Sequence, residues 1–360
     1  MIGTIARGED SLQIHWWDGS LSDGMKGCRI VAGLGFFDGV HLGHQVILRQ
    51  VLEVAATLDA VPAIVTFDRH PLTTIRPEAV PQLLTDGEER KQYLLDFGMK
   101  AVIELTFNKQ LARLEPEQFA SDILAKRLGV VAVIAGEDFR FGYQGRGGID
   151  LLRKDGDKWG IGFVQAVDSV IVGDEKVSST RIRGLLLEGM VEEAAELLGR
   201  PYKLIGPVVE GEGRGKKLGF PTANLAIPPK RLIPKDGVYA VTIRQPMEIT
   251  QTGQLATAGE LLGVLSVSDK PTFAGATRAV EVHILDEEKD YYGKKLEVSF
   301  HRRLRSIRKF ANAEELQSQV TRDIKTVREL FSGQFMSTED TPPIGRIGGP
   351  GEKIYSLKAL

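Results

Sequence analysis

Between residues 29 and 170, short runs of β-branched and apolar residues alternate with segments of helical periodicity. RIVAGLG (29–35) predicts a buried strand, and HQVILRQVLEVAATL after it carries apolar residues at helical spacing. Further strands are predicted over 62–67, 101–107 and 130–136, with helices near 86–97 and 116–128. This alternation predicts a parallel sheet with helices on its faces. Ligands of such sheets bind at the carboxyl ends of the strands, so we expect a site in the loops after Gly35, Phe67 and Gly136.

The pattern changes from residue 177 onward. SSTRIRGLLLEG and VEEAAELLG predict two short helices, the first capped by Ser178 or Ser179. After GRPY (199–202), strands follow one another without helices, which predicts a small antiparallel barrel or sandwich. These strands are expected at 203–211, 237–244, 261–268, 278–285 and 295–304, before an amphipathic helix at 312–331. The expected division is therefore 1–198, 199–331 and a disordered tail, 332–360. The stretch 245–260 is expected to be a long hairpin loop without an assigned role.

Bulk composition excludes several classes of protein. The formal net charge of the 360 residues is −2, so nothing global favours a nucleic acid or an anionic membrane as partner. Cys28 is the only cysteine, which excludes internal disulfides and a thiolate metal cluster. The first residues lack the apolar core of a signal peptide, and no apolar run is long enough to span a membrane. We expect a cytoplasmic protein without nucleic-acid or membrane partners; its oligomeric state cannot be read.

His41 and His44 lie three residues apart where the predicted strand 29–35 gives way to a helix. Backbone N–H groups and the helix dipole at such a point favour anions. Two imidazoles there can donate hydrogen bonds to phosphate oxygens during phosphoryl or nucleotidyl transfer. Two other interpretations stay open: a zinc site, which would need a third protein ligand, and a pair of structural surface histidines.

The segment SSTRIR (178–183) begins a predicted helix with three hydroxyls and two arginines. Hydroxyl and N–H groups at a helix start, with arginine for bidentate contacts, suit a triphosphate. The alternative is a well-capped amphipathic helix without a ligand.

Residues 211–225 read GEGRGKKLGFPTANL, with glycines and cations directly before Pro-Thr-Ala-Asn. The stretch is not a P-loop, because Lys217 stands where Ser or Thr is required, and its glycines lack the dinucleotide-binding spacing. Glycines flanked by cations are typical of a backbone that approaches an anion. Taken alone, PTAN indicates only a tight turn that leads into a strand.

Together, GFFDGVHLGH and SSTRIR resemble the nucleotidyltransferase half of the prokaryotic FAD synthetases, the bifunctional riboflavin kinase/FMN adenylyltransferases. TFDRHP (66–71) and GEDFRFG (136–142) are similar to flavin-site motifs of that family. The resemblance implies a Rossmann-like domain that converts FMN and ATP into FAD and pyrophosphate, with His41 and His44 stabilising the ATP phosphates. The implied ATP contacts are Gly35, Phe37, Asp38, Gly39, His41, His44, Ser178, Ser179, Thr180, Arg181 and Arg183. The implied flavin contacts are Asp68, His70, Asp138 and Phe139.

GEGRGKKLGFPTANL resembles the riboflavin kinase half of the same family. The resemblance implies a β-barrel that uses ATP to phosphorylate riboflavin, with Thr222 and Asn224 holding Mg²⁺. It makes Glu281, on the alternating strand RAVEVHILD, the general base for the ribityl 5′-hydroxyl; without the resemblance, Glu281 is a solvated strand residue. The implied kinase ATP contacts are Gly213, Arg214, Gly215, Gly219, Pro221 and Thr222.

The chain departs from the family pattern at several positions. Phe36 stands where the family often has Asn, and Arg69 where it commonly has Pro, and we expect both to tune the first site. The kinase half departs further: Ser266, Ser268 and Lys270 replace Asn, Gly and Arg, and Ile307 replaces Glu. We expect a kinase with weakened or altered flavin binding.

Two other functions stay open. In the first, the chain is an FMN adenylyltransferase only, and the kinase-like half is a flavin-binding or structural module. In the second, it is a regulatory protein that binds flavin or RNA through HRRLRSIRKF (301–310).

Overall fold

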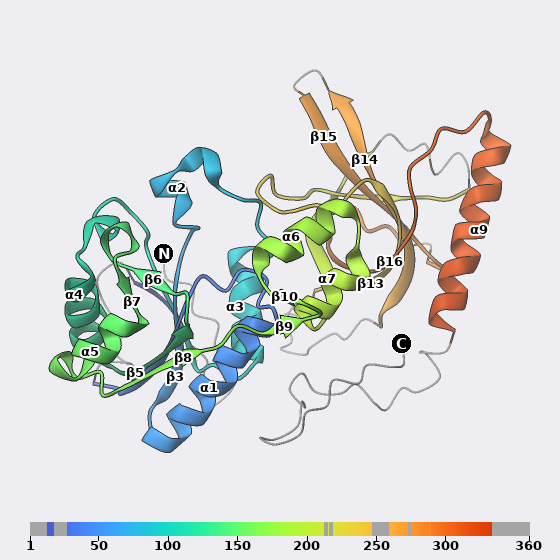
Figure 1. Cartoon of the computed structure of the whole chain (residues 1–360). Coiled ribbons are helices and arrows are strands. Elements are labelled where there is room, and N and C mark those ends of the chain that lie inside the picture. The colour runs from blue at the N-terminus through green and yellow to red at the C-terminus, as the bar shows by residue number, and fades with distance from the viewer. Residues whose placement is uncertain are drawn as a thin grey trace.

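Two differently built parts follow one another along the chain (Figure 1). The computed structural model describes residues 13–17, 27–211, 215, 219–246, 259–272, 275–287 and 289–332. Its first part is a parallel sheet with helices on both faces, and its second part is a closed antiparallel barrel followed by a long helix. The α/β and β-barrel classes predicted from the sequence are both confirmed, and the barrel alternative holds over the sandwich.

Six parallel strands form the sheet, in the order β1-β4-β3-β2-β5-β8. They are β1 (Gln13–Trp17), β2 (Ile30–Leu34), β3 (Val61–Phe67), β4 (Ala101–Leu105), β5 (Val130–Gly136) and β8 (Phe163–Val167). From β2 the chain adds β3 and β4 on one side, and it later adds β5 and β8 on the other. Such a topological switch point, here between β2 and β5, leaves a crevice at the carboxyl ends of the two strands.

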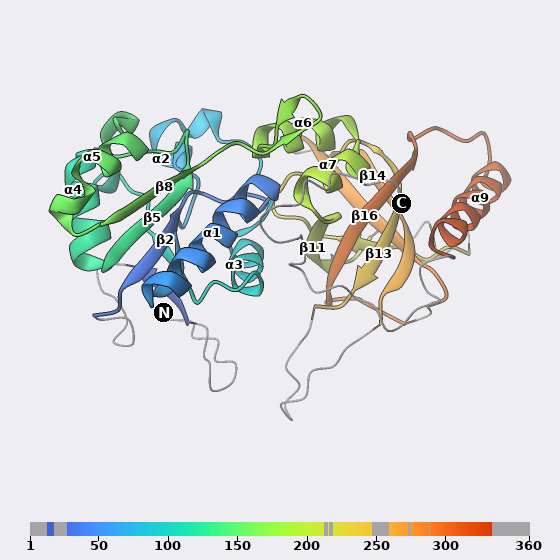
Figure 2. The same ribbon diagram turned by 60° about the horizontal axis from the view of Figure 1, so that its bottom comes forward.

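Helices cover both faces of this sheet (Figure 2). α1 (Leu42–Leu58) and α3 (Gly87–Asp96) share a buried cluster with Val31 of β2. On the other face, α5 (Ile149–Trp159) and the helical segment of α4 (Pro116–Gln118) and η4 (Phe119–Arg127) pack against Ile30. Ile30 and Val31 serve opposite faces because successive side chains of a strand alternate.

Short elements connect these helices and strands. They are α2 (Leu72–Ile75), η2 (Pro77–Ala79), η3 (Leu111–Arg113), β6 (Arg140–Phe141), η5 (Tyr143–Gly145), β7 (Gly147–Gly148), β9 (Ile171–Val172) and β10 (Glu175–Lys176).

Six antiparallel strands close the barrel in the order β11-β12-β15-β14-β13-β16. They are β11 (Tyr202–Val209), β12 (Ala223–Leu225), β13 (Gly237–Arg244), β14 (Leu261–Thr272), β15 (Gly275–Ile284) and β16 (Lys295–Arg305). α9 (Ala313–Phe331) packs on the outside through Val327 and Phe331. Asn312 caps this helix by accepting from the N–H of Glu315. A closed sheet has no exposed edge strand, which removes a site of edge-to-edge aggregation.

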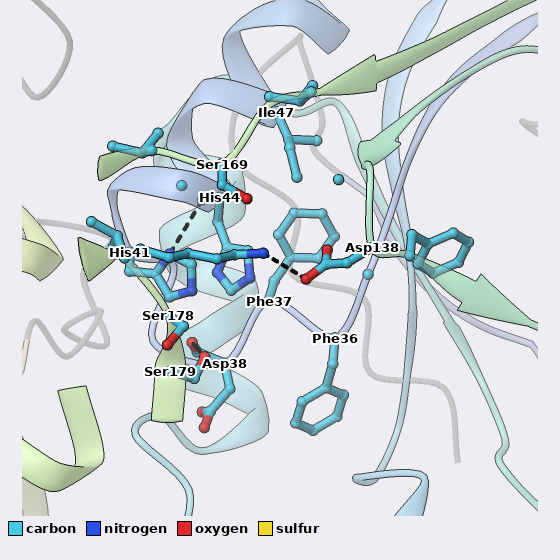
Figure 3. Close-up of a pocket in the computed structure, with 18 of the residues that line it drawn as sticks. Phe36, Phe37, Asp38, His41, His44, Ile47, Asp138, Ser169, Ser178 and Ser179 are labelled. Atoms are coloured by element: carbon cyan, nitrogen blue, oxygen red, sulfur yellow. Dashed lines mark hydrogen bonds and ion pairs between the residues drawn. The ribbon is translucent and has the colours of Figure 1, made fainter. Parts of the chain in front are cut away.

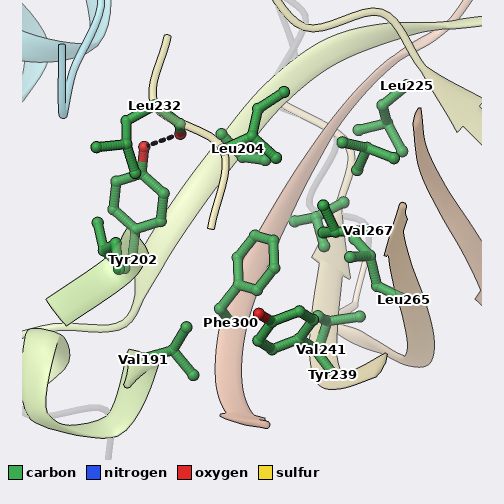
Figure 4. Packing of buried hydrophobic residues seen from close by; sticks show 14 of the residues in the cluster. Val191, Tyr202, Leu204, Leu225, Leu232, Tyr239, Val241, Leu265, Val267 and Phe300 are labelled. Atoms are coloured by element: carbon green, nitrogen blue, oxygen red, sulfur yellow. Dashed lines mark hydrogen bonds between the residues drawn. The ribbon is translucent and has the colours of Figure 1, made fainter. Parts of the chain in front are cut away.

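The two helices between sheet and barrel pack on the barrel. α6 (Ser179–Glu188) and α7 (Val191–Leu198) bury Ile182, Leu186 and Val191 in the same cluster as Phe300 of the barrel. Figure 4 shows Val191 in this cluster with the rings of Phe300 and Tyr239, which meet edge to face. α6 therefore begins beside the sheet and ends on the barrel.

A buried ion pair also joins the two parts. Glu89 of α3 lies 2.7 Å from Arg231, which precedes β13, and each side chain is only 5% exposed. Beside it, Leu83 exchanges backbone hydrogen bonds with residues 230 and 232. No helix of the described residues is long and apolar enough to cross a membrane.

Sequence patterns missed β1, α5 and β8, whereas the strand expected after the PTAN turn is found as β12, three residues long. β8 is only partly buried, so it does not carry a full apolar period. α5 contains Gly156, which lowers the helix propensity of the segment. Glycine is needed at this position because the Cβ of any other residue would lie 2.8 Å from the carbonyl oxygen of Ile161. The tail beyond Ser332 and most of the 245–260 stretch lie outside the described residues.

Candidate active sites

The first candidate site is a cavity of about 360 Å³ at the carboxyl ends of β2 and β5 (Figure 3). We call it the sheet pocket. Residues from three distant segments line it, in the loops that the strand–helix pattern singled out and at the start of α6. The expected site residues on its walls are Gly35, Phe37, Asp38, His41, His44, His70, Asp138, Phe139, Ser178, Ser179, Thr180 and Arg183. Gly39, Asp68 and Arg181 do not line it.

A strained loop enters the pocket between β2 and α1. Phe37 and Val40 have positive φ angles of 58° and 41°, a region that non-glycine residues seldom occupy and that is unfavourable for β-branched Val. Phe37 is fully buried, and the N–H of Gly39 donates to Oγ1 of Thr85 at 3.1 Å. Backbone strain of this kind persists only where surrounding contacts hold it, and it is typical of functional sites.

His41 and His44 stand at the start of α1. His41 caps the helix, with Nδ1 accepting from the N–H of His44, and the two rings stack at 3.7 Å between centroids. Burial lowers the pKa of His41 to about 4 and holds the pKa of His44 well below its usual range. Both imidazoles are therefore neutral at pH 7 and each carries one N–H donor. Nδ1 of His44 is buried and finds no hydrogen-bond partner within the described part of the chain.

The start of α6 forms a second wall of the sheet pocket. Ser178 caps the helix by accepting from the N–H of Arg181, as one of the two predicted caps, and Oγ of Ser179 donates to the carbonyl of Asp38. The N-termini of α1 and α6 thus both face one cavity. Two helix N-termini offer free N–H groups and positive dipole ends to an anion.

Asp38 and Arg183 hold the pocket together from behind. The carboxylate of Asp38 accepts from the N–H groups of Leu84 and Thr85 and lies 2.6 Å from Nη2 of Arg183. Nε of Arg183 donates to the carbonyl of Gln82. Both side chains line the cavity, but their charges are already matched to each other.

Arg181 and Asp68 fix neighbouring loops. Arg181 donates to the carbonyls of Val172 and Glu175 and so holds the β9–β10 hairpin. Asp68 accepts from the N–H of Phe107 at 3.0 Å and pairs with exposed Arg69.

Three of the four residues expected to contact flavin, His70, Asp138 and Phe139, line the pocket. The rings of His70 and Phe36 meet edge to face, with 4.9 Å between their centres. The guanidinium of Arg90 lies 4.4 Å from the centre of the Phe36 ring. Phe36, one of the departures from the family pattern, is therefore a pocket wall. Asp138 forms an ion pair of 2.6 Å with Lys176 of the β9–β10 hairpin (Figure 3). Lys176 was not found from the sequence, since a lone lysine in a short turn has no signature.

The second candidate site lies on the outside of the barrel. Asn224 of β12 is in register with Glu281 of β15, and Glu281 is in register with Ser266 of β14. Directly opposed residues of antiparallel strands point to the same face, so these three form a row, which we call the barrel row. Val280 and Val282 are buried on the other face, as the alternation around Glu281 predicts.

The PTAN turn is packed beside the barrel row. The carbonyl of Pro221 lies 2.8 Å from Nδ1 of His283, two residues beyond Glu281. A Cβ on Gly215 would lie 3.3 Å from Oγ1 of Thr222, and one on Gly211 would overlap the amide of Asn224. These close approaches explain two glycines of GEGRG. Gly219 has φ +82° in the same turn, and Gly213 and Arg214 lie outside the described residues.

The remaining departures from the family pattern in the second half lie outside the barrel row. Ser268 is in register with Ala279, and Lys270 with Thr277, further along β14. Ile307 is 43% exposed in the segment after β16.

The basic segment 301–310 is largely neutralised by the protein itself. Arg305 makes a bidentate pair with Asp323 of α9, Arg302 pairs with Glu192 and Arg308 with Glu315. These pairs argue against the RNA-binding hypothesis. The zinc hypothesis also lacks support, because no group of three His, Cys, Asp or Glu side chains suited to a metal occurs among the described residues.

Comparisons with known proteins agree with this two-site arrangement. Residues 25–181 match the family model described as FAD synthetase, and residues 198–331 match the one described as riboflavin kinase. The bifunctional riboflavin kinase/FMN adenylyltransferase of Escherichia coli K12 is 34% identical over 306 residues, 85% of this chain and 93% of that protein. The protein of that name from Listeria monocytogenes is 36% identical, over 84% of this chain and 92% of that protein.

A solved structure shares the overall fold. The crystal structure of a protein from Streptococcus pneumoniae named a macrolide-efflux protein superposes with a TM-score of 0.73 at 32% identity. The superposition covers 84% of this chain and 94% of that one.

Proposed function

The chain belongs to the family of bifunctional riboflavin kinase/FMN adenylyltransferases, and from this premise we propose where each of its two reactions takes place. The enzyme phosphorylates riboflavin with ATP to give FMN, and it transfers the adenylyl group of a second ATP to FMN to give FAD and pyrophosphate. We assign adenylyl transfer to the sheet pocket and phosphorylation to the barrel row. We also propose the division 1–198 and 199–331, and a cytoplasmic location, since both reactions consume ATP.

In the sheet pocket, a phosphate oxygen of FMN attacks the α-phosphorus of ATP, and the bond to the β-phosphate oxygen breaks to release pyrophosphate. Negative charge develops on the phosphate oxygens. His41 and His44, each a neutral N–H donor, and the N-terminus of α6 line the pocket, and we assign to them the electrostatic stabilisation of this charge. Fixing both substrates in line supplies roughly 7–11 kcal/mol of the barrier. The observation that carries this assignment is the convergence of the two helix N-termini on one cavity.

At the other end of the sheet pocket, the flavin side, we place FMN near His70, Asp138 and Phe139, with Phe36 as an additional wall. Lys176, paired with Asp138, is the further cation that can reach a phosphate once that pair opens.

In the barrel row, Glu281 accepts the proton of the ribityl 5′-hydroxyl while that oxygen attacks the γ-phosphorus of ATP and ADP leaves. The glycine-rich segment before PTAN holds the nucleotide. Asn224, opposite Glu281, and Thr222 of the preceding turn would supply neutral oxygen ligands, a donor set that with a carboxylate suits Mg²⁺. When bound, Mg²⁺ would neutralise phosphate charge. General-base catalysis by a carboxylate positioned near the hydroxyl, the role assigned to Glu281, increases the rate by roughly 10²–10⁴-fold.

A product assay tests both assignments. Purified protein is incubated with ATP and Mg²⁺, once with riboflavin and once with FMN, and the flavins are separated by chromatography. We expect FMN and FAD from riboflavin and FAD from FMN. FAD from FMN alone would refute the kinase assignment and leave the barrel as a binding module, whereas no flavin product in either reaction would refute both.

A further inference from the structure

Arg200 contacts the loop at the start of the sheet pocket, although it lies outside the part of the chain that matches FAD synthetase. It lies outside residues 25–181, which match FAD synthetase, and inside 198–331, which match riboflavin kinase. Its guanidinium nevertheless reaches the loop that precedes His41. Nη2 donates to the carbonyl of Gly39 at 2.7 Å, and Nη1 donates to the carbonyl of Val40 at 3.2 Å.

A second side chain makes the same connection. Nε2 of Gln45, in the first turn of α1, donates to the carbonyls of Val40 and Leu198. Nη1 of Arg200 donates to the carbonyl of Leu198 as well, at 3.2 Å. The end of α7 and the strained loop are therefore clasped by two side chains that bind the same two carbonyls.

The guanidinium is held in place from its other side. It lies 3.7 Å from the ring centre of Tyr93 in α3, in a stacking contact that arginine makes and lysine does not reproduce. Gly199 just before it has φ +71°, and a Cβ there would lie 3.0 Å from Leu42 of α1. The chain between α7 and the barrel thus lies tightly against the start of α1.

We infer that Arg200 is a positioning residue for adenylyl transfer: it holds the carbonyls of Gly39 and Val40 so that the loop keeps the conformation that aims His41 and His44 into the sheet pocket. This rests on the proposed function of that pocket. Arg200 does not line the cavity, so it acts through the loop and not on the substrate. The barrel half thereby completes the active site of the other half.

The test compares both activities of full-length Arg200→Gln, Arg200→Lys and wild type. A misplacement of about 1 Å costs about 10²-fold in rate, so we expect kcat for FAD formation from FMN to fall by about this factor in Arg200→Gln. KM for ATP and the rate of riboflavin phosphorylation should stay within about threefold, so that FMN accumulates. Arg200→Lys, which keeps the charge and one donor direction, should recover part of kcat. Arg244→Gln, an exposed arginine of β13 paired with Glu260, is the matched control and should change neither activity.

Each other result overturns the inference. Equal loss of both activities with a lower melting temperature would show a general structural role. A change in KM alone would show a binding role, and an unchanged kcat would show no role. If the wild-type protein forms no FAD from FMN, the proposed function itself is refuted. This result is obtained from the wild-type protein alone, without the variants.

Discussion

Asn224 and Glu281 lie directly opposite each other on the neighbouring antiparallel strands β12 and β15. The pair places a side-chain amide beside a carboxylate on the outer face of the barrel, while Val280 and Val282 are buried inside. Ser266 extends the row on the far side of Glu281. Register alone thus brings together the groups to which we assign riboflavin phosphorylation.

Replacing Glu281 should separate the two activities. Glu281→Gln keeps the shape of the side chain but cannot accept the ribityl proton, so we expect riboflavin phosphorylation to fall by roughly 10²–10⁴-fold. FAD formation from FMN should be unchanged. Glu260→Gln, directly before β14, is the control. Parallel loss of both activities would show that Glu281 supports the fold instead.

Ser266 is the departure with the clearest geometric consequence. Ser266→Asn restores the usual family residue and extends a longer hydrogen-bonding group beside Glu281. One neutral hydrogen bond contributes about 0.5–1.5 kcal/mol, so KM for riboflavin should fall by a few-fold to about tenfold. Steady-state kinetics with riboflavin measures this. A KM that stays the same or rises would contradict the prediction of weakened flavin binding at this position.

The histidine pair should act in adenylyl transfer alone. His41→Asn keeps a side chain that can cap α1 while it removes the imidazole donor. Loss of one such donor costs about 10²–10³-fold in kcat, and we expect this for FAD formation, with riboflavin phosphorylation unaffected. His44→Gln should behave in the same way. A rate within about threefold of wild type for both variants would remove the histidines from the mechanism.

Burial of His41 makes stability depend on pH. Its pKa is lowered to about 4 in the folded protein and lies near 6.5 in the unfolded chain, so only the unfolded state gains this proton between these values. This group has no effect on stability above pH 6.5, and stability falls as pH decreases from 6.5 towards 4, by about 3 kcal/mol. Urea unfolding at pH 7.5, 6, 5 and 4.5 should show a steeper loss for wild type than for His41→Asn. Identical slopes would contradict the lowered pKa.

The ion pair between the two parts should be sensitive to the loss of one partner. Arg231→Met leaves Glu89 buried without its counter-charge, which typically costs about 3–5 kcal/mol. We expect a clear decrease in thermal stability, and Glu89→Leu in the same chain should recover much of it, because a buried pair is often replaced by apolar residues with little loss. Additive losses in the double variant would show that the two charges do not act as a pair.

Local sequence determined the elements and most of the chemistry. Predicted strands 29–35, 62–67 and 237–244 agree with the structure to within a residue or two, because apolar periodicity and flanking turns act over a few neighbouring residues. Ser178 was one of two predicted caps for the same reason: a cap bonds to an N–H three residues away.

Only the tertiary structure decided how distant groups meet. The barrel row depends on strand register, and Lys176 and Arg200 contact residues that are far from them in sequence. The start of α6 lines the sheet pocket, but α6 and α7 bury their apolar faces in the barrel. A helix pattern shows that a face must be buried but not against which partner, since that choice follows from packing and from hydrogen bonds made once the chain has folded. The sequence therefore indicated which reactions the protein catalyses, and packing determined which of its residues lie close enough together to take part in one site.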